Sequence, residues 1–208
     1  MSTLRARQKE DRRNRIVSSA KRLFEKKGYD RTTIENIAES AGVSGVTVHN
    51  YYGTKAGVLL ALVIENDQKL ITRLENELPE TAEDLISLTM AFARIILDHA
   101  INNLDKVIWR QVIAAVTIDP DTQLSKSYSK LDTQLAYVLV RRIEALQTAE
   151  KLPASIDPAH LGNALFHLQN ALFIQFISRD NYSQEEIETR LRNDLLALIA
   201  VPSMDSNS

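Results

Sequence analysis

Apolar residues recur along most of the chain at the three- and four-residue spacing of one face of a helix. No stretch alternates with the period of two that a half-buried strand shows. The first apolar face runs from Ile16 to Phe24 and stops before Gly28. Further helices are expected at about 34–41, 44–52, 55–78, 81–102, 104–118, 120–149, 158–178 and 184–200. The pattern predicts an all-α fold with about nine helices.

Residues that cap helix N-termini stand at most of the predicted starts. Thr32 and Glu35 have the spacing of a capping box, in which each side chain bonds the other's backbone N–H. Gly42 is placed to end the second helix, and Pro120 suits the first turn of the seventh. The other expected caps are Ser44, Thr54, Thr81 with Asp84 at the third helical position, and Ser183 with Glu186.

Charge is distributed unevenly along the 208 residues. Residues 1–60 carry twelve Lys and Arg against six Asp and Glu, and the remainder carries thirteen against twenty-one. A basic front on an acidic body indicates a module that faces a polyanion, with a solvated charged helix end as the alternative. The basic excess is densest from Arg5 to Arg15. That run is expected to be a solvated arm, with insertion into a minor groove as the second possibility.

Several classes of site are disfavoured by what the sequence lacks. There is no cysteine for a disulfide or a thiolate metal site, which fits a reducing compartment. The longest apolar run, 56–64, is about half a membrane span, and the N-terminus has no apolar leader, so a cytoplasmic protein is expected. His160 and His167 lie too far apart for a metal pair, and no nucleophile or phosphate-loop motif occurs. We expect no metal, no cofactor and no enzyme activity.

Two short predicted helices joined by "AGVS" form a helix-turn-helix pattern. The second must be narrow and polar outside to enter a major groove about 12 Å wide. Val48 and Tyr52, four residues apart, can point back to the core. The outer side then carries Val46, Thr47, His49 and Asn50.

The stretch from Arg15 to Leu59 resembles the tetracycline-repressor (TetR) family of bacterial transcription regulators. The resemblance rests on Gly28, Tyr29, Thr32, Thr33, Ile37, Ala38, Ala41, Gly42, Val43, Ser44, Thr47, Val48, Tyr51 and Lys55. It implies phosphate contacts by Thr33, Thr47, Tyr51 and Lys55, and a base or phosphate contact by His49. The DNA-binding residues expected from pattern and resemblance together are Thr33, Ser44, Gly45, Val46, Thr47, His49, Asn50, Tyr51 and Lys55.

Base readout by these residues looks sparse. Gly45 has no side chain to read a base, and Val46 offers only apolar contact, for example to a thymine methyl group. Asn50 can pair with adenine through two hydrogen bonds, and the His49 imidazole can bond a guanine acceptor or a phosphate. We therefore expect DNA shape to supply part of the specificity.

The resemblance implies a DNA-binding domain at 1–54, a ligand-binding and dimerisation domain at 55–201 and a disordered tail at 202–208. The family dimerises through its last two helices and holds a small molecule among the preceding ones. The pocket candidates are Phe92, Trp109, Arg110, Tyr137, Asn163, Phe166 and Asn170.

The leading hypothesis is a homodimeric repressor that binds a palindromic operator in double-stranded DNA and is released by a small-molecule effector. The effector would shift the 55–78 helix and so change the spacing of the two DNA-reading helices. The alternatives are a helical ligand-binding protein or enzyme with a vestigial DNA module, and a nonspecific architectural DNA binder.

Overall fold

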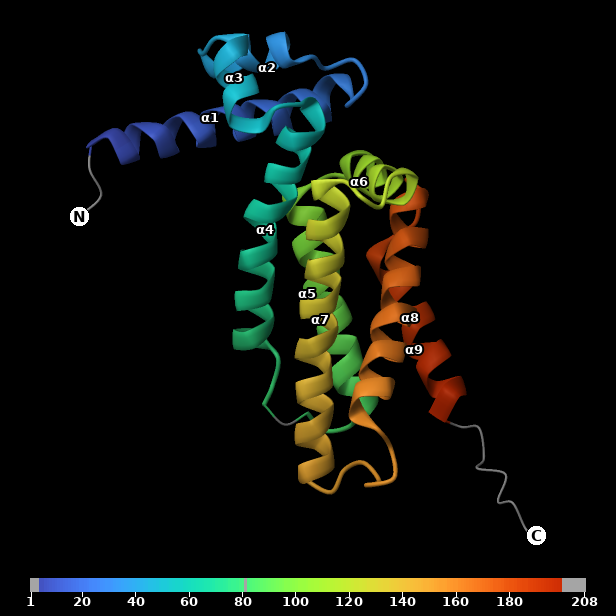
Figure 1. Ribbon diagram of the computed structural model, residues 1–208. Coiled ribbons are helices and arrows are strands. Elements are labelled where there is room, and N and C mark those ends of the chain that lie inside the picture. Colours follow the sequence, from blue (N-terminus) through green and yellow to red (C-terminus); the bar gives the residue numbers. More distant parts are fainter. Residues whose placement is uncertain (1–3, 81, 200–208) are drawn as a thin grey trace. The chain divides into compact units, whose positions relative to one another are not determined.

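The computed structural model describes residues 4–80 and 82–199 and gives the backbone alone at residues 65–67. Within these ranges the chain forms nine helices and no strand, so the all-α prediction is confirmed (Figure 1). The helices are α1 Leu4–Lys27, α2 Ile34–Ala41, α3 Gly45–Tyr52, α4 Lys55–Glu77, α5 Leu85–Asn103, α6 Lys106–Ile118, α7 Gln123–Thr148, α8 Pro158–Ser178 and α9 Gln184–Ile199.

The chain divides into two compact units. The first contains α1 to α3, most of α4, α6 and the start of α7, and the second contains the end of α4, most of α5 and α7, and all of α8 and α9. The expected domain limits at residues 54 and 201 stay predictions. Residue 201 and the expected tail at 202–208 lie outside the described residues.

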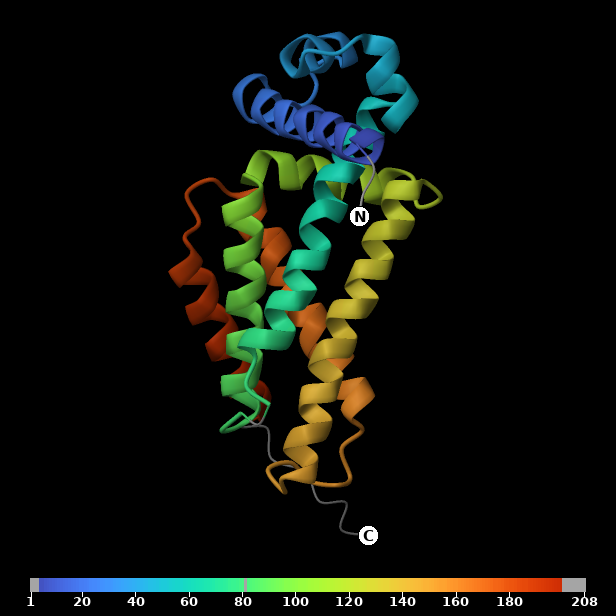
Figure 2. The same ribbon diagram turned by 90° about the vertical axis from the view of Figure 1, so that its left-hand side faces the viewer.

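In the first unit α2 and α3 lie on one side of α1 (Figures 1 and 2). Their shared core contains Ile16, Phe24, Ile37 and Val48, each fully buried. Complete burial of an aliphatic or aromatic side chain of this size contributes about 1.5–3 kcal/mol. These few side chains therefore fix the orientation of two helices that are each only eight residues long.

Residues 4–15 form the N-terminal half of α1, and every one of them is exposed. The stretch is therefore solvated, as expected, and it takes the form of an extended helix end. No residue of this stretch faces the core, so apolar periodicity did not reveal a helix. Arg, Lys, Gln, Glu and Ala are nevertheless strong helix formers, and they extend α1 beyond its buried half.

Two of the expected caps are placed differently. Thr33, not Thr32, caps α2: its Oγ1 accepts from Asn36 N at 3.2 Å, and Asn36 Oδ1 accepts from Thr33 N at 3.2 Å. Thr32 is 1% exposed, and its hydroxyl donates to Gly28 O at 2.8 Å, at the end of α1. Because Thr32 packs inward, the capping box is formed by Thr33 and Asn36 instead of Thr32 and Glu35.

The start of α5 also differs from expectation. Asp84 lies immediately before α5, and its Oδ1 accepts from Ser87 N at 2.7 Å, so it caps the helix instead of standing inside it. The expected partner Thr81 lies outside the described residues.

Pro120 precedes α7 rather than opening it, because Thr122 Oγ1 accepts from Ser125 N at 3.1 Å and serves as the cap. The capping box of Ser183 and Glu186 is confirmed.

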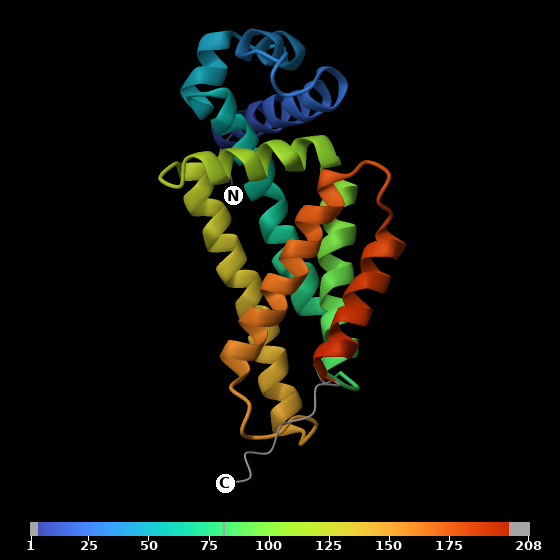
Figure 3. The ribbon, with the colours of Figure 1, turned by 90° about the vertical axis from the view of Figure 1, so that its right-hand side faces the viewer.

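In the second unit α8 and α9 lie side by side (Figure 3). Asp157 caps α8 by accepting from the backbone of Ala159 and His160, and Pro158 occupies the first turn. Arg94 of α5 pairs with Glu188 of α9 at 2.7 Å. Among the described helices α5 alone has the length and apolar content of a membrane span. More than half of its most apolar window is buried inside the protein, as in a core helix.

Candidate nucleic-acid interface

The turn between α2 and α3 depends on a left-handed residue. Gly42 has φ of +64°, and its N–H donates to Glu39 O at 3.1 Å, while Val43 N donates to Ala38 O at 3.0 Å. A β-carbon strains this conformation, which is why glycine occupies the position. Ala38 is 3% exposed at the crossing, as its small side chain predicts. The helix-turn-helix prediction is therefore confirmed in geometry.

Two arginines of α1 hold the C-terminal end of α2. Arg15 Nη1 donates to Ala41 O at 3.2 Å, and Arg22 Nη2 donates to Ser40 Oγ at 3.0 Å. A cation at this end also complements the helix dipole. Part of the basic excess of the first sixty residues thus has a structural use inside the unit.

The exposed face of α3 is the one expected from helical spacing. Ser44 caps the helix, with its Oγ accepting from Thr47 N at 3.2 Å and lying 2.9 Å from Thr47 Oγ1. Val48 is fully buried, whereas Val46 is 69% exposed. His49 and Asn50 are exposed as well, and Gly45, Thr47, Tyr51 and Tyr52 are half-buried. The structure therefore presents an imidazole, an amide and a valine on one outward surface.

The start of α2 carries a negative group at the place where Thr33 was expected to bind phosphate. Thr33 itself is exposed. Hydrogen bonds from the backbone N–H of Glu35 and from the Thr33 side chain lower the pKa of the Glu35 carboxyl group. A carboxylate at a helix N-terminus occupies the position that suits an anion. Phosphate binding by Thr33 stays a prediction.

Lys55 is engaged within the protein. Its ammonium donates to Tyr29 O at 2.7 Å and to Asp30 O at 3.4 Å, and it lies 4.2 Å from the centre of the Tyr29 ring. Burial, with Asp30 as a smaller cause, raises the pKa of the Tyr29 hydroxyl, and the Tyr29 ring packs against Phe24. Lys55 thus ties the start of α4 to the loop after α1. Its expected phosphate contact stays a prediction.

The seven expected pocket residues are divided between the two units, and a pocket shared by all of them stays a prediction. Trp109 and Arg110 are on α6 in the first unit, and the other five are in the second. Phe92 and Phe166 are buried and Asn170 is half-buried. Tyr137 is 62% exposed, and Asn163 is exposed with its amide donating to Ala159 O. The expectation that these last two face an internal pocket is not met within one chain, because helical phase turns them outward.

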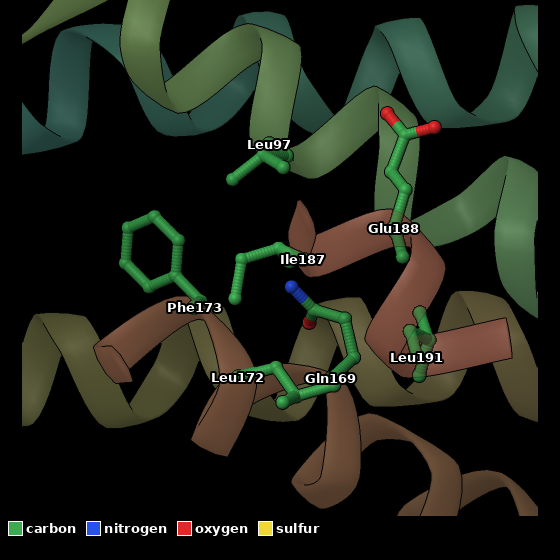
Figure 4. Close-up of a pocket in the computed structure, with 8 residues that line it drawn as sticks. Leu97, Gln169, Leu172, Phe173, Ile187, Glu188 and Leu191 are labelled. Atoms are coloured by element: carbon green, nitrogen blue, oxygen red, sulfur yellow. The ribbon is translucent and has the colours of Figure 1, made fainter. Parts of the chain in front are cut away.

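A small cavity of about 10 Å³ lies between α5, α8 and α9 (Figure 4). It is the size of one water molecule, whereas effector pockets measure about 300–1,000 Å³. Gln169, which is 5% exposed, directs its amide into this cavity, and Glu188 lies at its border (Figure 4). Neither Gln169 nor Glu188 was predicted. Nothing in the sequence distinguishes a buried Gln in an apolar helix from an exposed one. No cluster of metal ligands occurs in the described part of the chain.

Comparison with known proteins places these features in context. Residues 16–62 match the family model described as bacterial regulatory proteins, tetR family. The HTH-type transcriptional regulator HbdR of Aromatoleum sp. (strain CIB) is 38% identical over 76 residues, which are 36% of this chain and 31% of HbdR. The fatty acid metabolism regulator protein of Bacillus subtilis (strain 168) is 28% identical over 96 residues, 44% of this chain and 50% of that protein. The matched segments thus span a third to a half of these curated relatives.

Two solved structures share the fold over most of the chain. A transcriptional regulator from Saccharomonospora viridis in complex with choline has a TM-score of 0.69 at 24% identity, covering 89% of this chain and 95% of that one. FadR of Thermus thermophilus in complex with lauroyl-CoA has a TM-score of 0.65 at 21% identity, covering 94% and 98%.

Six further helices follow the helix-turn-helix in the described part of the chain, and the two solved structures share this fold. The similarity to the tetR family of bacterial regulatory proteins covers residues 16–62, which contain α2 and α3.

Proposed function

We propose that the chain is a cytoplasmic transcriptional regulator that binds a palindromic operator as a homodimer and releases it when a small-molecule effector binds. The observation that carries the proposal is the outward surface of α3. Val46, His49 and Asn50 are exposed on a helix whose other side is held by a fully buried Val48. A short helix with such a face matches the dimensions of the major groove.

Dimerisation is supported by apolar side chains on α8 and α9 that the described residues of one chain leave exposed. Ile174, Leu196, Leu198 and Ile199 are 38%, 49%, 61% and 53% exposed. Pairing two copies over these residues would remove them from water. A two-fold pair would also present two copies of α3, which a palindrome requires.

An effector is supported by two neighbours of the same fold, one in complex with choline and one with lauroyl-CoA. An effector regulates binding only through a difference in its affinity for the DNA-bound and free conformations. Because α4 follows α3 directly and runs on into the second unit, it is the element that we propose transmits the difference.

The test begins with selection of a duplex from a random pool by the purified chain. We expect an inverted repeat that is bound at least about 10³-fold more tightly than unrelated DNA at the same salt concentration. Choline, lauroyl-CoA and a broad metabolite panel are then added to the complex, and DNA release and melting temperature are recorded.

Equal affinity for all duplexes would contradict operator binding and favour the architectural DNA binder. An operator complex that no small molecule alters, in affinity or in melting temperature, would contradict the effector part alone. Absence of binding to any duplex would favour a helical ligand-binding protein.

A further inference from the structure

The first three turns of α1 project as a helix that no other described element covers. Residues 4–15 are exposed throughout, and Ile16 is the first buried residue. At 1.5 Å per residue this half of the helix is about 18 Å long. Figure 1 shows it extending beyond α2 and α3.

Three basic side chains form a row along this projection. Arg5, Lys9 and Arg12 follow the four- and three-residue spacing that places residues on one helical face. By the same helical spacing, Glu10 and Asp11 lie on other sides of the helix. We call Arg5, Lys9 and Arg12 the basic stripe.

The basic stripe does little for the stability of the protein itself. Of its three side chains, Arg12 donates to Gln8 O at 3.3 Å, within the same exposed helix. The first turn of α1 contains no acidic residue, and cations near a helix N-terminus oppose the helix dipole. This contrasts with Arg15, which bonds Ala41 O of α2. A bound polyanion would remove the unfavourable charge.

The basic stripe lies close to α3. It lies on the same face of α1 as the fully buried Ile16. At the base of the stripe, the hydroxyl of Tyr52, the last residue of α3, donates to Arg13 O at 3.5 Å. The stripe and α3 therefore belong to the same compact unit, and α3 contacts the backbone of α1 at Arg13.

We propose that the basic stripe binds the phosphates of duplex DNA that flanks the half-site read by α3. This proposal rests on the proposed function and extends the DNA contact beyond the helix-turn-helix. A helix is too wide for a minor groove of about 6 Å, so the stripe contacts the backbone and carries no base preference. It raises affinity for long duplexes and does not alter which sequence is preferred.

The triple variant R5A/K9A/R12A tests the proposal on the selected duplex. One duplex ends at the half-sites, and a second extends one helical turn beyond each. Each lost phosphate contact lowers the slope of log affinity against log salt by about 0.9. We expect the slope on the long duplex to fall by about two to three per chain and its advantage over the short duplex to disappear.

The control R7A/K126A/K130A removes the same three charges from exposed positions outside the stripe. We expect it to keep the wild-type slope and the advantage of the long duplex. Circular dichroism checks that both variants stay helical, which alanine favours.

A triple variant with the wild-type slope and length dependence would overturn the proposal, as would a control that loses as much as the triple variant. In both cases binding of the selected duplex by the wild type would leave the proposed function standing. A wild type that selects no duplex would overturn the proposed function first.

Discussion

Asn50 is the exposed residue of α3 whose side chain can form two hydrogen bonds with a single base edge. We expect Asn50→Ala to cost about 1–3 kcal/mol on the preferred duplex and to relax preference at one base pair per half-site. Asn163→Ala, which removes an exposed amide from α8, serves as the matched control. Competition binding with single-base variants of the duplex measures both. Uniform weakening on all variants would show that Asn50 docks the helix without reading a base.

Asp132 gives the stability of the protein a dependence on pH. Burial raises the pKa of its carboxyl group from 3.8 to about 6. The folded chain therefore holds this proton more tightly than the unfolded chain, and stability falls as the pH rises from 3.8 to about 6. The loss is at most about 3 kcal/mol, since one pKa unit corresponds to about 1.4 kcal/mol.

Asp132→Asn removes this titration. We expect the variant to melt at a higher temperature than the wild type at about pH 8 and to differ little at about pH 4. The exposed Asp121→Asn is the control for a general change of charge. An equal gain at both pH values would show that the effect does not arise from ionisation of Asp132.

Some residue roles followed from the sequence and others did not. Burial of Val48 and exposure of Val46 and Asn50 follow from helical phase alone. The choice between Thr32 and Thr33 as the cap does not, because either threonine has a hydrogen-bonding partner three residues later. Only the packing of Thr32 against the end of α1 decides it.

At the scale of elements, the junction between α3 and α4 has no room for a larger residue at Gly57. An added β-carbon would collide with the Tyr52 carbonyl oxygen at the end of α3. We expect Gly57→Ala to force the two helices apart, to destabilise the protein by about 1–3 kcal/mol and to weaken binding of all duplexes. Melting temperature and duplex affinity measure the two effects.

Gly45 provides the control for that variant. It opens α3, and an added β-carbon there meets nothing within 4 Å. Gly45→Ala should therefore keep the melting temperature of the wild type or raise it slightly, since Gly is a weak helix former. An equal fall in melting temperature in both variants would show that close packing at Gly57 does not constrain the α3–α4 junction.

Helix positions could be predicted because residues that typically begin or end helices are frequent in the sequence. Gly28, Gly42 and Gly53 all adopt positive φ at the ends of helices, and Asp157 with Pro158 fixes the start of α8. The N-terminal half of α1 was missed because its stability comes from helix propensity, which leaves no apolar pattern.

At the scale of the whole molecule, the sequence indicates surfaces but not cavities. Leu196 and Leu198 of α9 are exposed and support pairing of two chains, whereas the regularly spaced Ile187, Leu191 and Leu195 are buried within one chain. The expected pocket residues were chosen by type, and residue type does not determine whether helices leave a space between them. Tyr137 illustrates this, since it lies on α7 with its side chain 62% exposed.

In the proposed complex two copies of α3, presented by paired chains, read one inverted repeat. The most direct measurement is the mass of the complex with the selected duplex, combined with binding to repeats whose half-site spacing is varied. We predict two chains on a repeat with half-sites about one helical turn apart, or a multiple of it, and steep loss of affinity when half a turn is inserted. A single chain on the duplex, with affinity that ignores the spacing, would contradict the account.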